Sequence, residues 1–236
     1  MQSTDTVKER WSADAVAFMR DACEYGAFHK ELAEQIRPYL PADGHICEPG
    51  CGLGYLSAEL AAFCRQVTAV DLSASAINFA KKRHNADNLN ICCGSVYAMN
   101  DSYDAMVFCY FGRTHEILEL AKKYCRGNTV ILKRCCAEHR FSIGQTRSRH
   151  EPDDMISVLK ENRVSFTHKL LTMEFGQPFV SLEAAVRFFA FYDKSGAEIN
   201  TETVLPRLQE ISHPVFRYYL PEKRTMDLIV FSATDL

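Results

Sequence analysis

The stretch His45–Ser73 constrains the fold of this chain more than any other. It starts with a short stretch, His45–Glu48, which follows the turn signal Asp43-Gly44. It then passes through three closely spaced glycines and enters an alanine-rich segment, Leu56–Cys64, with helical spacing. A β-branched run, Gln66–Val70, follows and ends at Asp71. This order predicts strand, sharp turn, helix and strand, which is the opening unit of an α/β sheet.

The three glycines predict a ligand site at the end of the first strand. Gly50, Gly52 and Gly54 lack Cβ atoms at a sharp turn, so a ligand can approach the backbone there. Asp71 closes the second strand, and open α/β sheets bind ligands at the carboxyl ends of their strands. We therefore expect an adenosine-type cofactor, with Asp71 accepting hydrogen bonds from its ribose hydroxyls.

The dinucleotide fingerprint is a weaker interpretation of the same residues. It requires G-x-G-x-x-G, and from Gly50 its third glycine falls on Tyr55. Glu48 stands two residues before the first glycine, where an acid suits an ammonium group better than a pyrophosphate. A nicotinamide-dependent oxidoreductase stays an alternative, as does a glycine turn that binds no ligand.

The pattern Glu48-x-Gly50-x-Gly52-x-Gly54, with a later acid at Asp71, resembles the S-adenosylmethionine site of the class I methyltransferases. The resemblance is specific from Ala42 to Leu132. It implies S-adenosyl-L-methionine as cofactor and S-adenosyl-L-homocysteine as product. The cofactor-binding residues it implies are Tyr25, His29, Glu48, Gly50, Cys51, Gly52, Gly54, Asp71, Leu72, Ser95, Val96 and Cys109.

The resemblance also implies roles for these residues. Glu48 and Gly50 would hold the methionine part, and Asp71 the ribose. Ser95 and Val96 would meet the adenine edge; the family often carries an acid where Ser95 stands. The N-terminal helices would lie over the cofactor, so Trp11, Tyr25 and His29 are candidates for lining the substrate pocket.

The composition of the chain indicates which classes of protein it fits and which it does not. The chain has 236 residues, 47% hydrophobic and 24% charged, which fits one soluble domain or one domain with an insertion. A net charge of −3 gives no global basic field for nucleic acid or an anionic membrane. No apolar run approaches the roughly 18 residues of a membrane span. The polar N-terminus does not read as a signal peptide, so we expect a cytoplasmic protein.

Ten cysteines are many for this length, yet no C-x-x-C pair occurs. We expect most of them to pack as small hydrophobes, and we expect no metal. A thiol-rich metal or redox site assembled in space is the alternative.

The remaining pattern predicts an α/β fold with a doubly wound, mostly parallel seven-stranded sheet. Its last strand is antiparallel, helices precede it, and a helical cap is inserted between strands six and seven. The seven predicted strands are 45–48, 66–70, 89–93, 103–109, 129–133, 164–175 and 225–233. The predicted helices start near 13, 27, 56, 74, 115, 152, 182 and 202. We expect one domain over 1–236, with an N-terminal helical cap at 1–40, the core at 42–175 and 216–236, and the inserted cap at 178–214.

The acceptor is less constrained. The cap and mild acidity favour a small molecule, with no membrane partner and nucleic acid disfavoured, because nucleic-acid enzymes usually need a basic track. The basic segment 134–150 keeps an RNA or protein acceptor open, and a non-catalytic cofactor-binding protein is a further alternative. Tyr110 and His115, near the end of the fourth strand, are the nearest catalytic candidates by topology, and Tyr25, His29 and His139 could reach the pocket from either side. The oligomeric state stays open.

Overall fold

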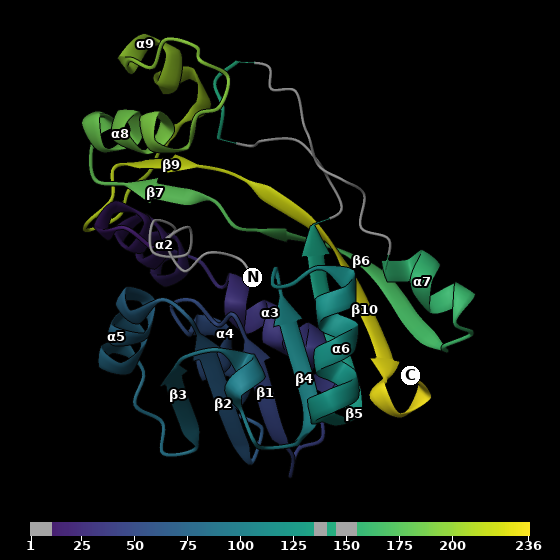
Figure 1. Ribbon diagram of the computed structural model, residues 1–236. Helices are drawn as coiled ribbons and strands as arrows, with labels where there is room; N and C mark the ends of the chain where they lie inside the picture. The colour runs from purple at the N-terminus through teal and green to yellow at the C-terminus, as the bar shows by residue number, and fades with distance from the viewer. Residues whose placement is uncertain (1–10, 135–140, 145–154) are drawn as a thin grey trace.

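The computed structural model describes residues 11–134, 141–144 and 155–236. Its main element is a seven-stranded sheet of order β3-β2-β1-β4-β5-β10-β6 (Figure 1). The strands of this large sheet are β1 (His45–Pro49), β2 (Gln66–Asp71), β3 (Leu89–Cys93), β4 (Tyr103–Cys109), β5 (Cys125–Arg134), β6 (Phe166–Glu174) and β10 (Lys223–Ser232).

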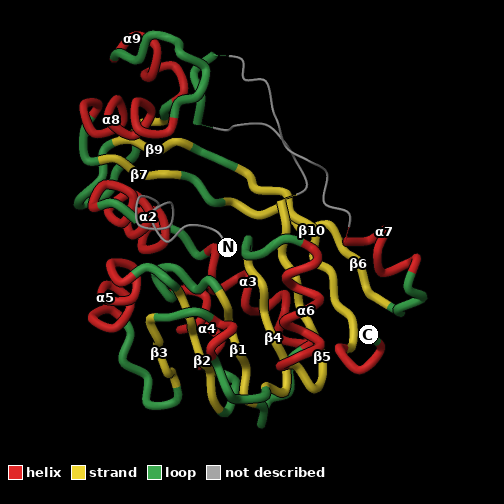
Figure 2. The backbone as a smooth tube through the Cα atoms, viewed as in Figure 1, coloured by secondary structure: helices red, strands yellow, loops and turns green. Residues whose placement is uncertain are grey.

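The direction of the strands confirms the predicted fold class. Strands β1 to β5 pair in parallel, whereas β10 runs antiparallel between β5 and β6. Strands β1 to β4 therefore end at one edge of the large sheet, where β5 also ends and β10 begins; we call it the carboxyl edge. Figure 2 shows the loops that leave the strands along this edge.

Helices cover both faces of the large sheet, as the alternation of strands and helices predicts. Serines open several of them: the side chains of Ser12, Ser73 and Ser181 accept backbone N–H groups at the starts of α2, α5 and α8. The helices are α2 (Ala13–Tyr25), α3 (Phe28–Ile36), α4 (Tyr55–Ala61), α5 (Ala74–Arg83), α6 (Thr114–Tyr124), α7 (Met155–Glu161), α8 (Leu182–Tyr192) and α9 (Thr201–Val204).

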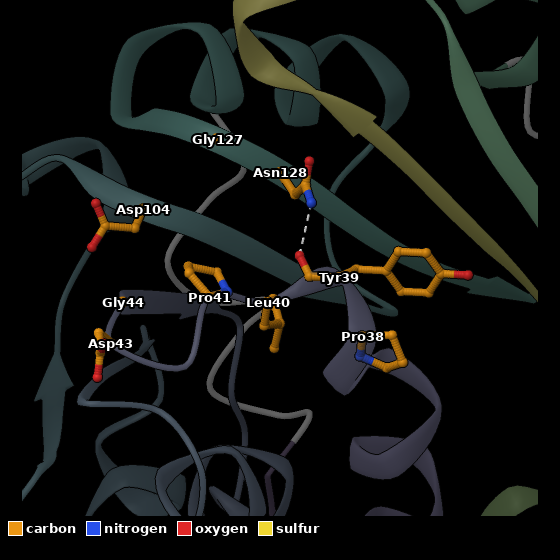
Figure 3. A pocket seen from close by; sticks show the side chains of 9 residues that line it. All are labelled: Pro38, Tyr39, Leu40, Pro41, Asp43, Gly44, Asp104, Gly127 and Asn128. Carbon is orange, nitrogen blue, oxygen red and sulfur yellow. Dashed lines mark hydrogen bonds between the residues drawn. The ribbon is translucent and has the colours of Figure 1, made fainter.

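A shallow hollow lies at the opposite, amino edge of the large sheet, where β4 and β5 begin. It holds about 610 Å³ and is lined by residues of the turn after α3 together with Asp104, Gly127 and Asn128 (Figure 3). The Asn128 side chain donates a hydrogen bond to the carbonyl of Tyr39 at 2.8 Å across it. Because this hollow lies at the far end of the strands from the glycines, it is not the predicted cofactor site.

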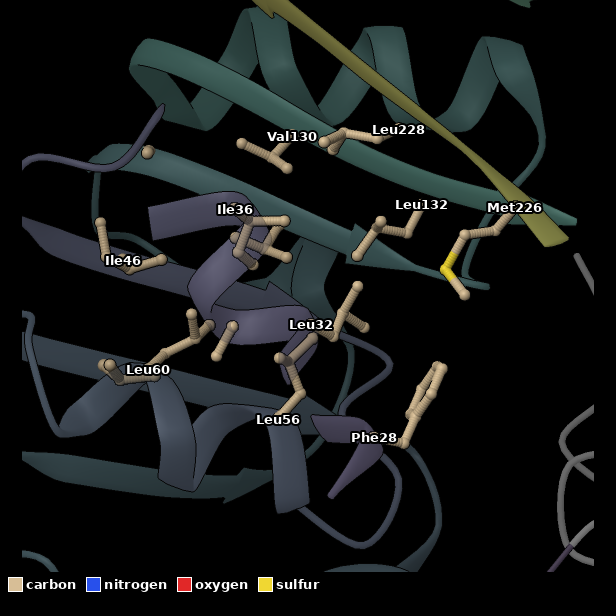
Figure 4. Packing of buried hydrophobic residues seen from close by; sticks show 14 of the residues in the cluster. Phe28, Leu32, Ile36, Ile46, Leu56, Leu60, Val130, Leu132, Met226 and Leu228 are labelled. Atoms are coloured by element: carbon tan, nitrogen blue, oxygen red, sulfur yellow. The ribbon is translucent and has the colours of Figure 1, made fainter. Parts of the chain in front are cut away.

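Alternate residues of each central strand supply two cores, one on each face of the large sheet. In β4, Val107 packs towards α3 and α4, whereas Phe108 packs towards α6. Figure 4 shows the first core, where α3 and α4 meet β5 and β10. The period of two therefore places Glu48 and Cys109 on the α3–α4 face, with Ile46 and Val107, at the carboxyl edge.

The inserted cap, which we define as residues 177–220, contains more than the predicted helices. Its three strands, β7 (Gln177–Phe179), β8 (Gln209–Glu210) and β9 (Tyr218–Leu220), form a second sheet of order β7-β9-β8. Helix α8 has the predicted bounds. The helix predicted over 202–211 is wrong in length: α9 ends at Val204, because Pro206 follows in a 3-10 turn and cannot donate the next hydrogen bond.

The described part of the segment after β5 is attached to the inserted cap. The Ser142 carbonyl accepts Arg207 at 2.8 Å, and the Ile143 amide donates to Asp193 at 2.9 Å. The predicted start of α7 near 152, the candidate base His139 and most basic residues of 134–150 lie outside the described residues.

The described residues include no helix that is long and apolar enough to cross a membrane. Among them, no group of three or more potential metal-ligating side chains comes together. The described cysteines are free thiols, and burial raises the pKa of several of them, including Cys47 and Cys51.

Candidate cofactor and acceptor site

The glycine turn, residues 50–54, is held against the end of β2 by its own backbone. The amides of Gly50 and Cys51 both donate to the carbonyl of Val70, at 2.7 and 3.1 Å. Gly50, Gly52 and Gly54 have φ angles of 71°, 55° and 76°, in the left-handed region that favours glycine. The sequence therefore needs glycine at these three positions for the turn itself.

Asp71 connects the ends of three strands. One carboxylate oxygen accepts the Gly52 amide at 2.9 Å and the other accepts the Ser73 amide at 2.8 Å. Its backbone carbonyl accepts the Gly94 amide at 2.9 Å, which brings the end of β3 alongside. Each carboxylate oxygen has a second lone pair, so the acid can still accept hydroxyl groups of a ligand.

Glu48 is an acid inside the protein. It is 3% exposed, and the hydroxyl of Ser57 in α4 donates to it. Burial raises the pKa of Glu48 to about 8, opposed by Ser57 and reinforced by the charge of Asp71. A buried carboxyl of this kind favours a cationic ligand, whose charge would stabilise the ionised form. The sequence predicted Glu48, but not its partner Ser57.

Two aromatic rings lie directly on the glycine turn. A Cβ built on Gly50 would come within 2.2 Å of the Phe111 ring, and one on Gly52 within 2.7 Å of Trp11. Trp11 is held there because its carbonyl accepts the Ser75 hydroxyl of α5 at 2.9 Å. Trp11, predicted for the substrate pocket, thus lies on the glycine turn.

The predicted adenine-side residues lie at the ends of β2 and β3. Leu72 is 51% exposed, directly after Asp71, whereas Val96 is buried. Ser95 caps the short 3-10 turn that starts at Val96, accepting the Tyr97 amide at 3.3 Å. The structure therefore brings Glu48, the glycine turn, Asp71 and this corner together at the carboxyl edge.

The end of β4 lies beside β1 and contributes Cys109 and Tyr110. Cys109 is close enough to Glu48 and Arg224 for their charges to act on its thiol. Burial and the negative charge of Glu48 raise the pKa of this thiol, whereas the positive charge of Arg224 lowers it. Tyr110 has a φ of 53°, which is uncommon for a residue with a side chain. Its hydroxyl donates to the Met226 sulfur at 3.5 Å, so the ring points to the α3–α4 face.

The second catalytic candidate, His115, is separate from this group. It lies in the first turn of α6 and is exposed. Within the described ranges it makes no hydrogen bond or ring contact with the glycine turn or Cys109. Of the two candidates, only Tyr110 lies on the α3–α4 face with Glu48.

His29 and Tyr25 lie on the N-terminal helices at different places. The His29 ring stacks on Tyr55 at 5.8 Å, at the start of α4, and packs edge-on to Phe175. Burial lowers the pKa of His29 to about 3, helped by the positive charges of Arg224 and His84. Tyr25 instead packs against Tyr219 of the inserted cap at 5.0 Å.

Sequence reasoning missed Arg224, at the start of β10. Its guanidinium lies 4.0 Å from the ring centroid of Phe175. The residue follows a long insertion and carries no motif, so only the fold shows that it reaches this region.

These residues fit a nucleoside cofactor that carries a cationic amino-acid chain. The glycine turn has the left-handed backbone of such a cradle, the Asp71 carboxylate has lone pairs at the end of β2, and Glu48 supplies a buried acid. The rings of Trp11 and Phe111 would lie against the bound ligand or be displaced by it.

Comparisons with known proteins agree with this geometry. Residues 46–128 match the family model described as a methyltransferase domain. Malonyl-[acyl-carrier protein] O-methyltransferase of Priestia megaterium (strain DSM 319 / IMG 1521) is 29% identical over 135 residues. That match covers 50% of this chain and 47% of the relative, so it spans about half of the relative's length.

Solved structures share the fold. Magnesium protoporphyrin IX methyltransferase of Synechocystis PCC 6803 with bound SAH has a TM-score of 0.56 at 13% identity, covering 96% of this chain and 98% of that one. The same enzyme with bound SAM has a TM-score of 0.53 and covers 97% of both chains. YcgJ of Bacillus subtilis has a TM-score of 0.52 at 10% identity, covering 88% and 98%.

Proposed function

We propose that this chain, whose residues 46–128 belong to the class I S-adenosylmethionine-dependent methyltransferases, transfers a methyl group to a small-molecule acceptor. The observation that carries the proposal is the joint position of Glu48, the glycine turn and Asp71 at one edge of the sheet. The dinucleotide alternative loses support, because Tyr55 starts a helix where its fingerprint needs glycine.

Each residue has a proposed task. When bound, S-adenosylmethionine supplies a methyl group on a sulfonium; the acceptor atom gains it while the carbon–sulfur bond breaks with its electrons staying on sulfur. Asp71 binds ribose hydroxyls, and Glu48 attracts the ammonium group. Phe111 and Trp11 offer ring faces, which attract cations and exclude water from the site. Gly50 and Gly52 allow close approach.

The acceptor is proposed to be small for two reasons. The net charge of −3 gives no global basic field for a nucleic acid. The inserted cap also stands over the carboxyl edge (Figure 1), and its ring cluster reaches α2 through Phe18 and Phe188, 5.1 Å apart. A cap in this position limits the size of an acceptor that reaches β4. The Priestia relative is named for an O-methyl transfer to malonyl-[acyl-carrier protein], in which a protein carries the malonyl group. This acceptor should therefore be tested beside small molecules, as the test of the alternative that the acceptor is a protein.

We also propose that residues 1–236 act as one domain, in which 1–40 and 178–214 cover the core. Glu24 supports this for the N-terminal part: it accepts Tyr55 of α4 at 3.0 Å and Arg83 of α5 at 2.7 Å. Tyr110 is the preferred catalytic candidate, because it lies at the end of β4 on the α3–α4 face. His115 is retained only as a surface alternative.

Calorimetry with S-adenosylmethionine, S-adenosylhomocysteine and NADH tests the cofactor, with Asp71→Ala as the variant. We expect micromolar binding of both sulfur compounds and its loss in the variant. Release of S-adenosylhomocysteine in the presence of an acceptor then tests turnover. Binding without turnover by any acceptor would favour the non-catalytic alternative. Binding of NADH alone would overturn the proposal.

A further inference from the structure

Ser57 connects helix α4 to the acid at the end of β1. Helix α4 packs on the face of the sheet that carries Glu48, through Leu56 and Leu60. Ser57 is the third residue of this helix and is 0% exposed. Its hydroxyl donates a hydrogen bond to Oε2 of Glu48. Because α4 begins where the glycine turn ends, this bond joins the helix after the turn to the acid before it.

The two carboxylate oxygens of Glu48 have different surroundings. Oε2 accepts the Ser57 hydroxyl, whereas Oε1 accepts no hydrogen bond from the residues that the structure describes. In the same part of the chain, the buried side-chain oxygen and nitrogen atoms that lack a partner are the hydroxyls of Tyr103 and Thr129. Since Oε1 is not one of these atoms, it keeps access to the surface. Glu48 thus has one oxygen held inside the protein and one left for a ligand.

The surroundings of Glu48 oppose its negative charge, and Ser57 favours it. Burial raises the pKa of Glu48 to about 8, the Ser57 hydroxyl lowers it, and the charge of Asp71 raises it. The other titratable groups within range of its charge are the thiols of Cys47, Cys51 and Cys109. Burial raises the pKa of all three thiols, so they are neutral at pH 7 and bring no compensating charge.

The hydroxyl of Ser57 has two consequences for a cationic ligand. A hydrogen bond to a carboxylate is stronger than one to a neutral carboxyl, so it favours the charged form, which attracts an ammonium group. A bond to Oε2 also restricts rotation of the carboxyl group, so Oε1 keeps its direction. Charge and direction are what a bound ammonium group requires of its partner.

Resting on the proposed function, we propose that Ser57 is a positioning residue for the amino-acid end of the cofactor: its hydroxyl holds Oε2 of Glu48 and directs Oε1 to the ammonium group. Ser57 itself does not touch the cofactor and acts only through the acid. Its loss therefore weakens ligands that carry the ammonium group and spares ligands that lack it.

Matched ligands and variants test this proposal. S-adenosylhomocysteine and S-adenosyl-4-thiobutyrate, which lacks only the amino group, are titrated into the full chain at pH 6.5 by calorimetry. The variants are Ser57→Ala, Glu48→Gln and the double variant. Ser232→Ala is the control, because it removes a hydroxyl that shares a hydrogen bond with Thr234 at the far end of β10. Thermal unfolding of each variant checks that it is folded.

We expect Ser57→Ala to weaken S-adenosylhomocysteine about tenfold, which is the scale of one charge-assisted hydrogen bond. The affinity for the deaminated analogue should stay unchanged. In the Glu48→Gln background, Ser57→Ala should have no further effect on S-adenosylhomocysteine, and Ser232→Ala should have none in either background. A merely structural role for Ser57 would weaken both ligands, with or without the acid at position 48.

A second readout needs no ligand. The stability that Glu48 contributes is lost as the pH rises towards its folded pKa of about 8. Without the Ser57 hydroxyl this pKa is higher, so the loss continues to a higher pH. The difference in urea midpoint between wild type and Ser57→Ala should therefore widen from pH 7 to pH 9. In the Glu48→Gln background the same difference should not depend on pH.

Four results would overturn the proposal: an unchanged affinity for S-adenosylhomocysteine in Ser57→Ala, an equal loss for the deaminated analogue, a loss that persists in the Glu48→Gln background, or a difference in urea midpoint that is independent of pH. If S-adenosylhomocysteine does not bind wild type, the proposed function fails instead. In that case the urea series still decides whether Ser57 favours the charged form of Glu48.

Discussion

The carboxylate of Asp71 accepts the backbone amide of Gly52 at 2.9 Å, so the acid at the end of β2 fixes the glycine turn at the end of β1. The same carboxylate accepts the Ser73 amide at 2.8 Å. A residue predicted only as a ligand contact therefore also shapes the site.

Replacing Asp71 with Asn tests this second role. The carboxamide has only one acceptor oxygen, so its NH₂ group faces one of the two backbone donors. We expect the free energy of unfolding to fall by about 1–3 kcal/mol, because this is the usual cost when a buried donor loses its hydrogen-bond acceptor. Urea denaturation measures it. Asp87→Asn, at an exposed position, should stay within about 0.5 kcal/mol of wild type; equal effects in the two variants would contradict the role.

Replacing Gly50 with Ala should destabilise the chain without touching any polar group. Its φ is 71°, and the new Cβ would come within 2.2 Å of the Phe111 ring. We expect a loss of about 1 kcal/mol or more in the free energy of unfolding, because backbone strain and steric overlap add. Gly94→Ala is the matched control, since a Cβ there meets nothing within 4 Å. Similar stability of the two variants in urea would show that the ring does not occupy this position.

The fluorescence of Trp11 should report cofactor binding. It is the only tryptophan of the chain, and its ring lies against Gly52. A nucleoside that enters the glycine turn must contact or displace this ring. We expect S-adenosylhomocysteine to shift its emission with the same affinity that calorimetry gives. Trp11→Phe removes the signal and serves as the blank. Binding that leaves the emission unchanged would place the ligand elsewhere.

Glu48 should give the chain a characteristic pH dependence. Its pKa in the folded protein, about 8, is above the ordinary value of 4.5, so between these two values the folded state binds more protons than the unfolded state. The stability that Glu48 contributes is therefore complete below about pH 4.5 and is lost as the pH rises towards 8. Urea denaturation of wild type and Glu48→Gln at pH 5, 7 and 9 measures it. The wild type should lose stability relative to the variant with rising pH.

The same ionisation should affect ligand affinity. S-adenosylmethionine, with its ammonium group, should bind wild type more tightly as the pH rises from 5 to 7, because more Glu48 is then charged while the ammonium group keeps its proton. Glu48→Gln should lack this rise. A difference in stability between wild type and variant that is independent of pH would contradict the raised pKa.

The elements with strong local signals were predictable from the sequence. The bounds of β3, β4 and α8 are confirmed, since each has clear periodicity and flanking turn residues. The small sheet of the inserted cap was not predicted, because its strands have two or three residues and β7 contains Pro178. A proline fits there because β7 is an edge strand of that sheet.

Only those parts of the site that belong to one local sequence motif could be predicted from the sequence. One βαβ unit contains Glu48, the glycine turn and Asp71. Their spacing in the sequence therefore predicts that they lie together at the carboxyl edge. Arg224 and Trp11 come from distant parts of the chain, and their places depend on strand register and helix packing. Phe111 is near in sequence to the end of β4, yet its contact with Gly50 depends on how the chain turns after that strand.

The inserted cap leaves and rejoins the large sheet at neighbouring points. The amide of Phe175, directly after β6, donates to the carbonyl of Glu222, directly before β10, at 2.7 Å. Residues 176–221 are thus an excursion from a single hairpin, whose closure costs little more when the excursion grows longer. Evolution can lengthen, shorten or exchange this segment while the register of the seven strands stays intact. Enzymes built on this plan can therefore diversify in what they accept without rebuilding the part that holds the nucleoside.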